Sequence, residues 1–323
     1  MRIFSTFLVH PCFSRILKQL VLAGLMSGTA LLSMAQADLV TDVRIALSQG
    51  NTARAESQVN SYRAQRGLDP EVTEATSWLG RAAFEANHLD AAEKYAKETR
   101  SMIAAQLKSR TLDAEPHLPL ALGAAIELQA QVLAARGQRT QAVTLLRTAL
   151  QTYRTTSIRP RIQKNLNLLT LVGRLAPPLS DVQHLGPEPK PIAASKGSPI
   201  LLFFWAHWCS DCKAEGPIIT RLRSEFAAQG MQVIAPTQYY GYAAQGQDAT
   251  PETELGWIEK VWQHFYPGLV DLPVPVSKKN FDVYGASTTP TLVLIDRKGL
   301  ISMYHPGVMP YDELRAAIER AVK

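Results

Sequence analysis

The chain has 323 residues, enough for two domains of ordinary size, and 46% of them are hydrophobic, which is ample for packed cores. Its formal net charge is +6, and Arg2, Arg15 and Lys18 contribute three of these charges before the first acidic residue. The remaining charge forms no long basic run, so nothing in the composition indicates a nucleic-acid partner. No long low-complexity segment is present either, which argues against a disordered chain.

Residues 1–37 have the pattern of a secretory signal peptide, with a basic start and a short apolar run from Leu20 to Met34. Ala35–Ala37 has the small-residue pattern of a cleavage site, and cleavage there would start the mature chain at Asp38 and remove Cys12. We therefore expect a periplasmic protein. An uncleaved membrane anchor is the alternative, but the run is shorter than the roughly 20 residues of a spanning helix. No later segment is expected to span a membrane.

Residues 38–175 carry almost no strand signal and are rich in Ala, Leu, Gln, Arg and Glu, which favour helices. Three turns share one pattern, in which a residue that tolerates positive φ (Gly50, Asn87 or Gly137) is followed five residues later by alanine. The segment resembles tetratricopeptide-like helical hairpins, closed by a helix near Ile162–Val172. The repeat spacing is irregular, so a generic helical bundle is the alternative.

Arrays of helical hairpins usually present a concave surface to another chain, so we expect this domain to bind a partner protein. The alternative is that it only stabilises or orients its neighbour. It holds no His/Asp/Glu cluster typical of catalysis, and we expect the isolated His88 and His117 to lie at the surface.

The motif that governs the second half of the chain is Cys209-Ser210-Asp211-Cys212, which follows the apolar run 201–205 and begins a helical pattern. Two cysteines so spaced at a helix start favour redox chemistry, because free N–H groups and the helix dipole stabilise a thiolate there. Half of a zinc site is one alternative, but zinc needs four ligands. A permanent structural disulfide is the other, although so small a loop gains little from closure.

Phe203–Pro217, with the sequence FFWAHWCSDCKAEGP, resembles the thioredoxin superfamily and in particular its TlpA/ResA-like thiol–disulfide oxidoreductases. A second match is Gly285–Thr291, with the sequence GASTTPT, which leads into an apolar strand. The resemblance begins at about residue 177, just after the helix-breaking Ala176-Pro177-Pro178. It implies an α/β thioredoxin-like fold for residues 176–323, preceded by the all-α helical-hairpin domain.

Patterns of apolar residues predict the strand and helix order β-α-β-α-β-β-α for the second domain, with a weak first strand before it. The expected elements are strand Leu179–Leu185, strand Ile200–Trp205, a helix from Cys209 to about Ala228, strand Met231–Ala235, a helix from Pro251, edge strand Val274–Val276, helix Lys278–Tyr284, strands Thr291–Asp296 and Leu300–His305, and helix Pro310–Val322. Pro236–Pro251 departs from a minimal thioredoxin. Its tyrosines indicate either local packing or a substrate groove.

The resemblance implies a role for each motif residue. Cys209 is the expected attacking thiolate, and Cys212 is the expected buried resolving thiol. Trp208 is expected to cover one side of the nucleophile. Pro290 matches the family's cis-proline, which would face the two cysteines and leave the Thr289 backbone free to pair with an extended substrate.

Three further residues should tune the site. Glu215 matches an acid of the TlpA/ResA-like proteins, and we expect it to accept the proton of Cys212 unless it is merely a solvated helix residue. Asp211 should oppose the Cys209 thiolate, which favours a reductase over a strong oxidant. His207 is expected to be a loop residue, and copper binding with the cysteines is the alternative.

We therefore expect an exported thiol–disulfide oxidoreductase, specifically a disulfide reductase, that exchanges disulfides with protein partners through Cys209 and Cys212. No metal or nucleotide cofactor is predicted beyond the redox-active Cys209–Cys212 disulfide, so the electrons should come from another redox protein. The alternative is a helical-repeat partner-binding or metal-handling protein that uses its thioredoxin-like domain mainly for recognition.

Overall fold

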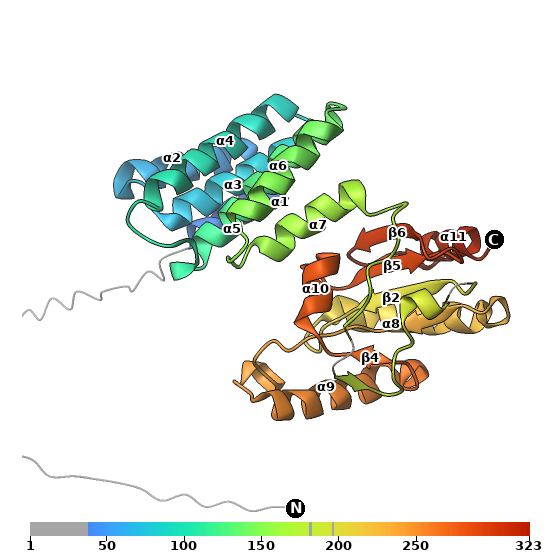
Figure 1. Cartoon of the computed structure of the whole chain (residues 1–323). Helices are drawn as coiled ribbons and strands as arrows, with labels where there is room; N and C mark the ends of the chain where they lie inside the picture. The colour runs from blue at the N-terminus through green and yellow to red at the C-terminus, as the bar shows by residue number, and fades with distance from the viewer. Residues whose placement is uncertain (1–37, 181–182, 196) are drawn as a thin grey trace, which may run out of the picture. The chain divides into compact units, whose positions relative to one another are not determined.

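The structure, a computed structural model, describes residues 38–180, 183–195 and 197–323. The predicted signal peptide of residues 1–37, with Cys12, lies outside the described residues. Residues 38–323 form one compact unit, in which seven α-helices precede an α/β region (Figure 1).

The first six helices of the described chain form three antiparallel hairpins, and a seventh helix follows them. In chain order they are α1 (Leu39–Ser48), α2 (Thr52–Arg66), α3 (Pro70–Glu85), α4 (Leu89–Gln106), α5 (His117–Ala135), α6 (Arg139–Thr152) and α7 (Arg159–Thr170). The three hairpin turns contain Gly50, Asn87 and Gly137, with φ of 71°, 59° and 76°. The prediction of positive-φ turns between paired helices is thus confirmed.

The alanines that follow these turns allow each second helix to approach the first. Ala55, Ala92 and Ala142 are each 0% exposed, and each lies in the first turn or two of the second helix of its hairpin. A larger side chain at these positions would hold the helices apart, so the repeated spacing reflects packing.

Helix α5 has the length and apolar composition of a membrane span, contrary to the expectation that no segment after residue 37 has them. Ten of its residues are buried, and α3, α4, α6 and α7 pack around it. Its apolar character therefore follows from its position inside the helical region. His117 at its start was expected to be isolated at the surface. Instead it is half-buried, and its Nδ1 lies 2.8 Å from Oε2 of Glu74.

The α/β region is built on a four-stranded sheet in the order β3-β2-β5-β6, in which β2 is parallel to β3 and antiparallel to β5, and β5 is antiparallel to β6. A separate two-stranded sheet pairs β1 with β4. The strands are β1 (His184–Leu185), β2 (Ile200–Phe204), β3 (Gln232–Ile234), β4 (Val274–Pro275), β5 (Thr291–Ile295) and β6 (Ile301–Pro306).

Helices cover both faces of this sheet: α8 (Ser210–Glu225), α9 (Pro251–Phe265), α10 (Lys278–Tyr284) and α11 (Tyr311–Ala321). All five residues of β2 are buried, which explains its unbroken apolar run. Leu201 and Phe203 pack in the cluster with α8, α9 and α11, whereas Leu202 and Phe204 pack in the cluster with α10.

Two expected elements differ at their ends. The described part of the first strand is only His184–Leu185, shorter than the predicted Leu179–Leu185. Helix α8 ends at Glu225 rather than near Ala228, because a short 3-10 turn, Ala227–Gln229, follows it.

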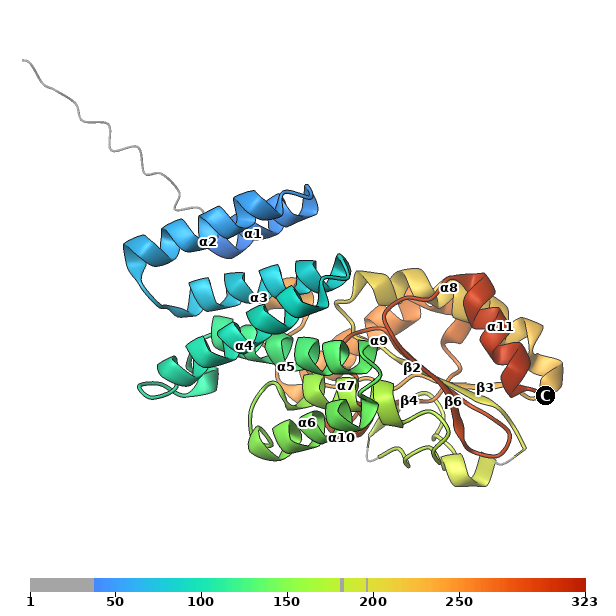
Figure 2. The same cartoon turned by 90° about the horizontal axis from the view of Figure 1, so that it is seen from above.

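Helix α7 joins the helical hairpins to the sheet region. Figures 1 and 2 both show it beside α10. Asn167 on α7 donates from Nδ2 to the carbonyl of Tyr284 at 2.8 Å, and Tyr304 on β6 donates its hydroxyl to the same carbonyl at 2.8 Å. These contacts place the helical region next to the loop that carries Pro290.

Candidate active site

Cys209 is the N-cap of α8, where the backbone leaves the extended conformation of β2 and enters the helix. Its Sγ accepts a hydrogen bond from the backbone N–H of Cys212 at 3.1 Å. Hydrogen bonds from the Cys212 side chain and backbone lower the pKa of Cys209 to about 6, although burial opposes this change. A large fraction of Cys209 is therefore a thiolate at neutral pH.

Cys212 lies one helical turn further on and is completely buried. Burial is the largest cause that raises the pKa of its thiol far above the ordinary value, and the neighbouring Cys209 adds to it. The two sulfurs thus differ in their protonation at neutral pH. This is the asymmetry that an attacking thiolate and a resolving thiol require.

The loop before β5 approaches Cys209 from the other side of the site. The Thr289–Pro290 peptide bond is cis, in agreement with the prediction for Pro290. The carbonyl oxygen of Thr289 lies 3.3 Å from the Sγ of Cys209. The structure therefore brings together the two sequence motifs, which are 80 residues apart in the chain.

Trp208 precedes Cys209 and is 50% exposed, so a partner molecule can reach its ring. The ring stands nearly perpendicular to that of Tyr240, with the ring centres 5.5 Å apart. Tyr240 belongs to the segment Pro236–Pro251, which we call the inserted loop, and it thus supports Trp208 beside the nucleophile. Tyr240 and Tyr242 also contact the ring of His207, which agrees with the local-packing interpretation of the tyrosines.

Glu215 is 1% exposed, so the alternative that it is a solvated helix residue is wrong. Its Oε2 accepts a hydrogen bond from the backbone N–H of Met309 at 3.2 Å, while Oε1 is buried without a partner among the described residues. Burial raises the pKa of this carboxyl to about 6. A buried carboxylate with a free oxygen and a pKa near neutrality is suited to accept a proton.

A buried His–Glu pair next to the cysteines was not foreseen. His207 lies in the loop between β2 and α8, as expected, but it is only 2% exposed. Its Nε2 lies 3.3 Å from Oε1 of Glu254, which is 1% exposed. Glu254 also accepts hydrogen bonds from the backbone N–H groups of Tyr240 at 2.6 Å and Gly241 at 2.8 Å. In the sequence, Glu254 is one of the acidic residues that follow the predicted helix start at Pro251. Acidic residues are common in the first turn of a helix, so this pattern did not indicate a partner for His207.

Asp211 was expected to oppose the Cys209 thiolate, and its effect has the expected sign but is small. Its charge raises the pKa of Cys209, but it is the smallest of the named causes, and the hydrogen bonds to the sulfur outweigh it. Within the described ranges, no three His, Cys, Asp or Glu side chains converge on a point that could hold a metal ion. The Nε2 of His207 faces Glu254.

Comparison with known proteins agrees with this geometry. Residues 190–321 match the model of the thioredoxin-like domain family, so the C-terminal region has a thioredoxin-like fold behind about seven helices. The chain is 27% identical over 148 residues to the thioredoxin-like protein YneN of Bacillus subtilis, covering 46% of this chain and 78% of that protein.

Two further relatives carry names from disulfide chemistry. The thiol-disulfide oxidoreductase ResA of Geobacillus thermodenitrificans is 27% identical over 152 residues, covering 46% of this chain and 76% of ResA. The thiol:disulfide interchange protein DsbE of Xylella fastidiosa is 29% identical over 113 residues, covering 35% of this chain and 49% of DsbE. The chain thus spans about half the length of that last protein.

Proposed function

We propose that the protein catalyses thiol–disulfide exchange with other proteins through Cys209 and Cys212. The observation that carries this proposal is the contrast between the two sulfurs, since the pKa of Cys209 is lowered to about 6 at the start of α8 while that of Cys212 is raised by burial. The similarity to proteins named for thiol–disulfide exchange supports the same reaction class.

In the first step, the Cys209 thiolate attacks one sulfur of a substrate disulfide. The substrate S–S bond breaks, a disulfide forms between Cys209 and the substrate, and the second substrate sulfur leaves as a thiolate that takes a proton from solvent. The extended substrate chain would pair with the backbone at Thr289, whose carbonyl lies 3.3 Å from Cys209.

In the second step, Cys212 loses its proton and attacks the Sγ of Cys209. The mixed disulfide breaks, the Cys209–Cys212 disulfide forms, and the first substrate sulfur leaves as a thiolate. Two electrons have then passed to the substrate. We assign the proton of Cys212 to Glu215, whose carboxyl has a pKa raised to about 6 and a buried oxygen without a partner.

We propose reduction as the direction, with the oxidised protein regenerated by a dithiol of another redox protein. The charge of Asp211 next to Cys209 favours this direction, because it raises the pKa of Cys209, although hydrogen bonds to the sulfur outweigh it. Equilibration with glutathione buffers tests it. A midpoint potential below about −200 mV is expected, whereas one near −120 mV would indicate an oxidant.

Export to the periplasm and partner binding by tetratricopeptide-like hairpins complete the proposal. The pattern of residues 1–37 supports export, and the three hairpins support partner binding. Detection of a secreted fusion whose mature chain starts at Asp38 tests the first. Recovery of the full-length chain in the membrane fraction would favour the uncleaved anchor.

The exchange activity is tested by the reduction of insulin with dithiothreitol as the electron donor. We expect the protein to accelerate the reaction well above the rate with dithiothreitol alone, and Cys209→Ser to return it to that rate. Cys212→Ser should accumulate mixed disulfides with substrate proteins, because the resolving thiol is missing. Full activity of a folded Cys209→Ser variant would overturn the proposal.

A further inference from the structure

We infer that a groove on the helical region binds the polypeptide segment next to the substrate's disulfide and selects segments with acidic side chains. This inference rests on the proposed exchange function and adds the class of substrate that the protein prefers. The groove consists of two adjoining hollows on the described chain, which we call the arginine groove.

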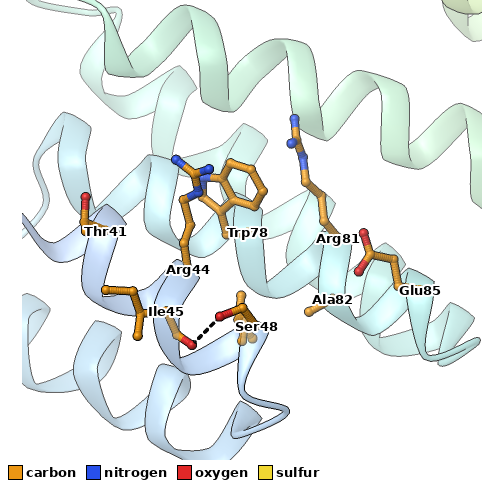
Figure 3. Close-up of a pocket in the computed structure, with 9 residues that line it drawn as sticks. Thr41, Arg44, Ile45, Ser48, Trp78, Arg81, Ala82 and Glu85 are labelled. Atoms are coloured by element: carbon orange, nitrogen blue, oxygen red, sulfur yellow. Dashed lines mark hydrogen bonds between the residues drawn. The ribbon is translucent and has the colours of Figure 1, made fainter. Parts of the chain in front are cut away.

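The first hollow lies between α1 and α3, and Figure 3 shows its lining. It has a volume of about 570 Å³. The second hollow lies between α3, α5, α7 and the loop before β5, and has a volume of about 670 Å³. Arg81 and Glu85 on α3 line both hollows, so the two meet there. Each hollow is large enough for several side chains of an extended peptide.

The second hollow ends beside the candidate active site. Ser287 and Thr288 line it, and Thr289, the next residue, places its carbonyl 3.3 Å from the Sγ of Cys209. Residues of an extended chain are about 3.3 Å apart, so a chain whose cysteine meets Cys209 places its neighbouring residues in the arginine groove after only a few steps.

The first hollow presents two guanidinium groups that form no ion pair within the described part of the chain. Arg44 and Arg81 lie over the ring of Trp78, at 4.7 and 4.4 Å from its centre, and neither forms an ion pair with another described residue (Figure 3). The indole N–H of Trp78 donates to Oε1 of the buried Glu74 at 3.3 Å, which fixes the ring. Stacked guanidinium groups keep their N–H edges available for a carboxylate.

The second hollow has more positive than negative charge. Arg161 and Lys164 both bind the single carboxylate of Glu127, at 2.7 and 3.1 Å. Burial and the charge of Arg161 lower the pKa of Arg81, while the carboxylates of Glu127, Glu74 and Glu85 act in the opposite direction without cancelling the effect. An incoming anion would therefore favour the charged form of Arg81. The charged side chains lining the two hollows are four basic residues and two acidic ones, namely Arg44, Arg81, Arg161, Lys164, Glu85 and Glu127.

These features identify the occupant as an acidic segment of polypeptide. Arginine binds carboxylates with two parallel hydrogen bonds, whereas a basic segment would meet the excess positive charge of the groove. The groove is therefore expected to discriminate between substrates that carry the same disulfide but differ in their flanking charges.

The test uses two synthetic peptides that contain the same intramolecular disulfide, one flanked by glutamates and the other by lysines. Fully reduced protein is mixed with each peptide, the reaction is quenched with acid, and the second-order rate constant for formation of the Cys209–Cys212 disulfide is measured by mass spectrometry. We expect a preference of about tenfold or more for the acidic peptide, which should decrease as salt is added.

Arg44→Gln and Arg81→Gln should each reduce this preference, and the double variant should bring the two rate constants close together. Arg44 is exposed, so its replacement is compatible with folding. Arg54→Gln is the matched control, because Arg54 is an exposed arginine of α2 that lies outside both hollows, and it should keep the preference.

A second measurement is independent of redox chemistry. The acidic peptide with serines in place of its cysteines is labelled with a fluorophore, and its binding is followed by anisotropy. It should bind the unaltered protein more tightly than the Arg44→Gln, Arg81→Gln double variant. Equal rate constants for the two peptides, or equal binding to protein and double variant, would overturn the arginine groove while leaving exchange activity intact. Failure to reduce either peptide or insulin would overturn both proposals.

Discussion

At the scale of single residues, the chemistry of the site depends on ionisable side chains that are buried with few hydrogen bonds to replace their contacts with water. Cys212 is completely buried, and burial raises its pKa. Glu215 is almost as deeply buried and keeps one hydrogen bond to Met309. The acid and the thiol therefore both favour their protonated forms, but the pKa of Cys212 is raised much further than that of Glu215. Transfer of the proton from Cys212 to Glu215 must therefore accompany the attack of Cys212 on the mixed disulfide.

Glu215→Gln should change stability in a pH-dependent way. Because folding raises the pKa of Glu215 from 4.5 to about 6, the folded state binds more protons than the unfolded state between these values, and the free energy of unfolding falls as pH rises through them. Glutamine does not ionise, so the variant should not show this fall. Measured by urea unfolding, the free energy of unfolding of the variant relative to that of the unaltered protein should rise by roughly 2 kcal/mol from pH 4 to pH 7.

Glu313→Gln serves as the control, because Glu313 is exposed. This variant should not reproduce the pH-dependent rise in relative stability. In kinetics, Glu215→Gln should slow the attack of Cys212 on the mixed disulfide and flatten the pH dependence of that step below about pH 6. Unchanged kinetics across this range would show that Glu215 is not the proton acceptor.

At the scale of elements, helix α9 positions the inserted loop through one side chain. Glu254 accepts hydrogen bonds from the backbone N–H groups of Tyr240 and Gly241 and contacts His207. Tyr240 in turn packs against Trp208 beside the nucleophile. Burial lowers the pKa of His207, which keeps its ring neutral over a wider pH range despite the neighbouring carboxylate. The geometry around Trp208 thus depends on a helix that begins far along the chain.

Glu254→Gln should loosen this loop, because the amide nitrogen that replaces one carboxylate oxygen cannot accept a hydrogen bond, so only one of the two backbone N–H groups keeps its acceptor. We expect a loss of about 1–3 kcal/mol in the free energy of unfolding and faster hydrogen exchange at Tyr240 and Gly241. Glu252→Gln, at an exposed position of the same helix, should leave both unchanged. Equal exchange rates in the two variants would contradict this role of Glu254.

At the scale of the whole molecule, the helical region and the sheet region meet closely at α7. Gly285 follows α10 with φ of 62°, and a Cβ there would lie 2.5 Å from the backbone nitrogen of Lys164. Asn167 supplies the hydrogen bond to Tyr284 next to it. This close approach holds Lys164, and with it one side of the arginine groove, near the loop of Thr289.

Gly285→Ala should therefore destabilise the protein more than an alanine at an unobstructed positive-φ glycine. Gly299→Ala is the matched control, since Gly299 has φ of 81° and its nearest atom to a new Cβ is 4.0 Å away. The control should lose about 1–2 kcal/mol for the backbone conformation alone. The Gly285 variant should lose more in urea unfolding and should show faster hydrogen exchange in α7. Equal losses would show that the contact with α7 can shift without cost.

Much of this arrangement could be predicted from the sequence, because its signals are local. The hairpin turns at Gly50, Asn87 and Gly137 depend on residues that accept positive φ. The redox motif depends on where a strand ends and a helix begins, so the position of Cys209 at the N-cap of α8 was already expected. The cis bond before Pro290 was inferred from the resemblance of the surrounding motif, since proline permits that bond.

Only the tertiary structure decided the properties that depend on residues far apart in the chain. The charge of Asp211 was expected to oppose the Cys209 thiolate, and it does raise the pKa, but hydrogen bonds to the sulfur outweigh it. The partner of His207 is 47 residues away, and no local pattern indicates that pairing. The arginine groove combines four helices of the helical region, α1, α3, α5 and α7, with the loop before β5. Burial, pairing and charge balance depend on which segments meet in space, whereas turns and caps depend on residues adjacent in the chain.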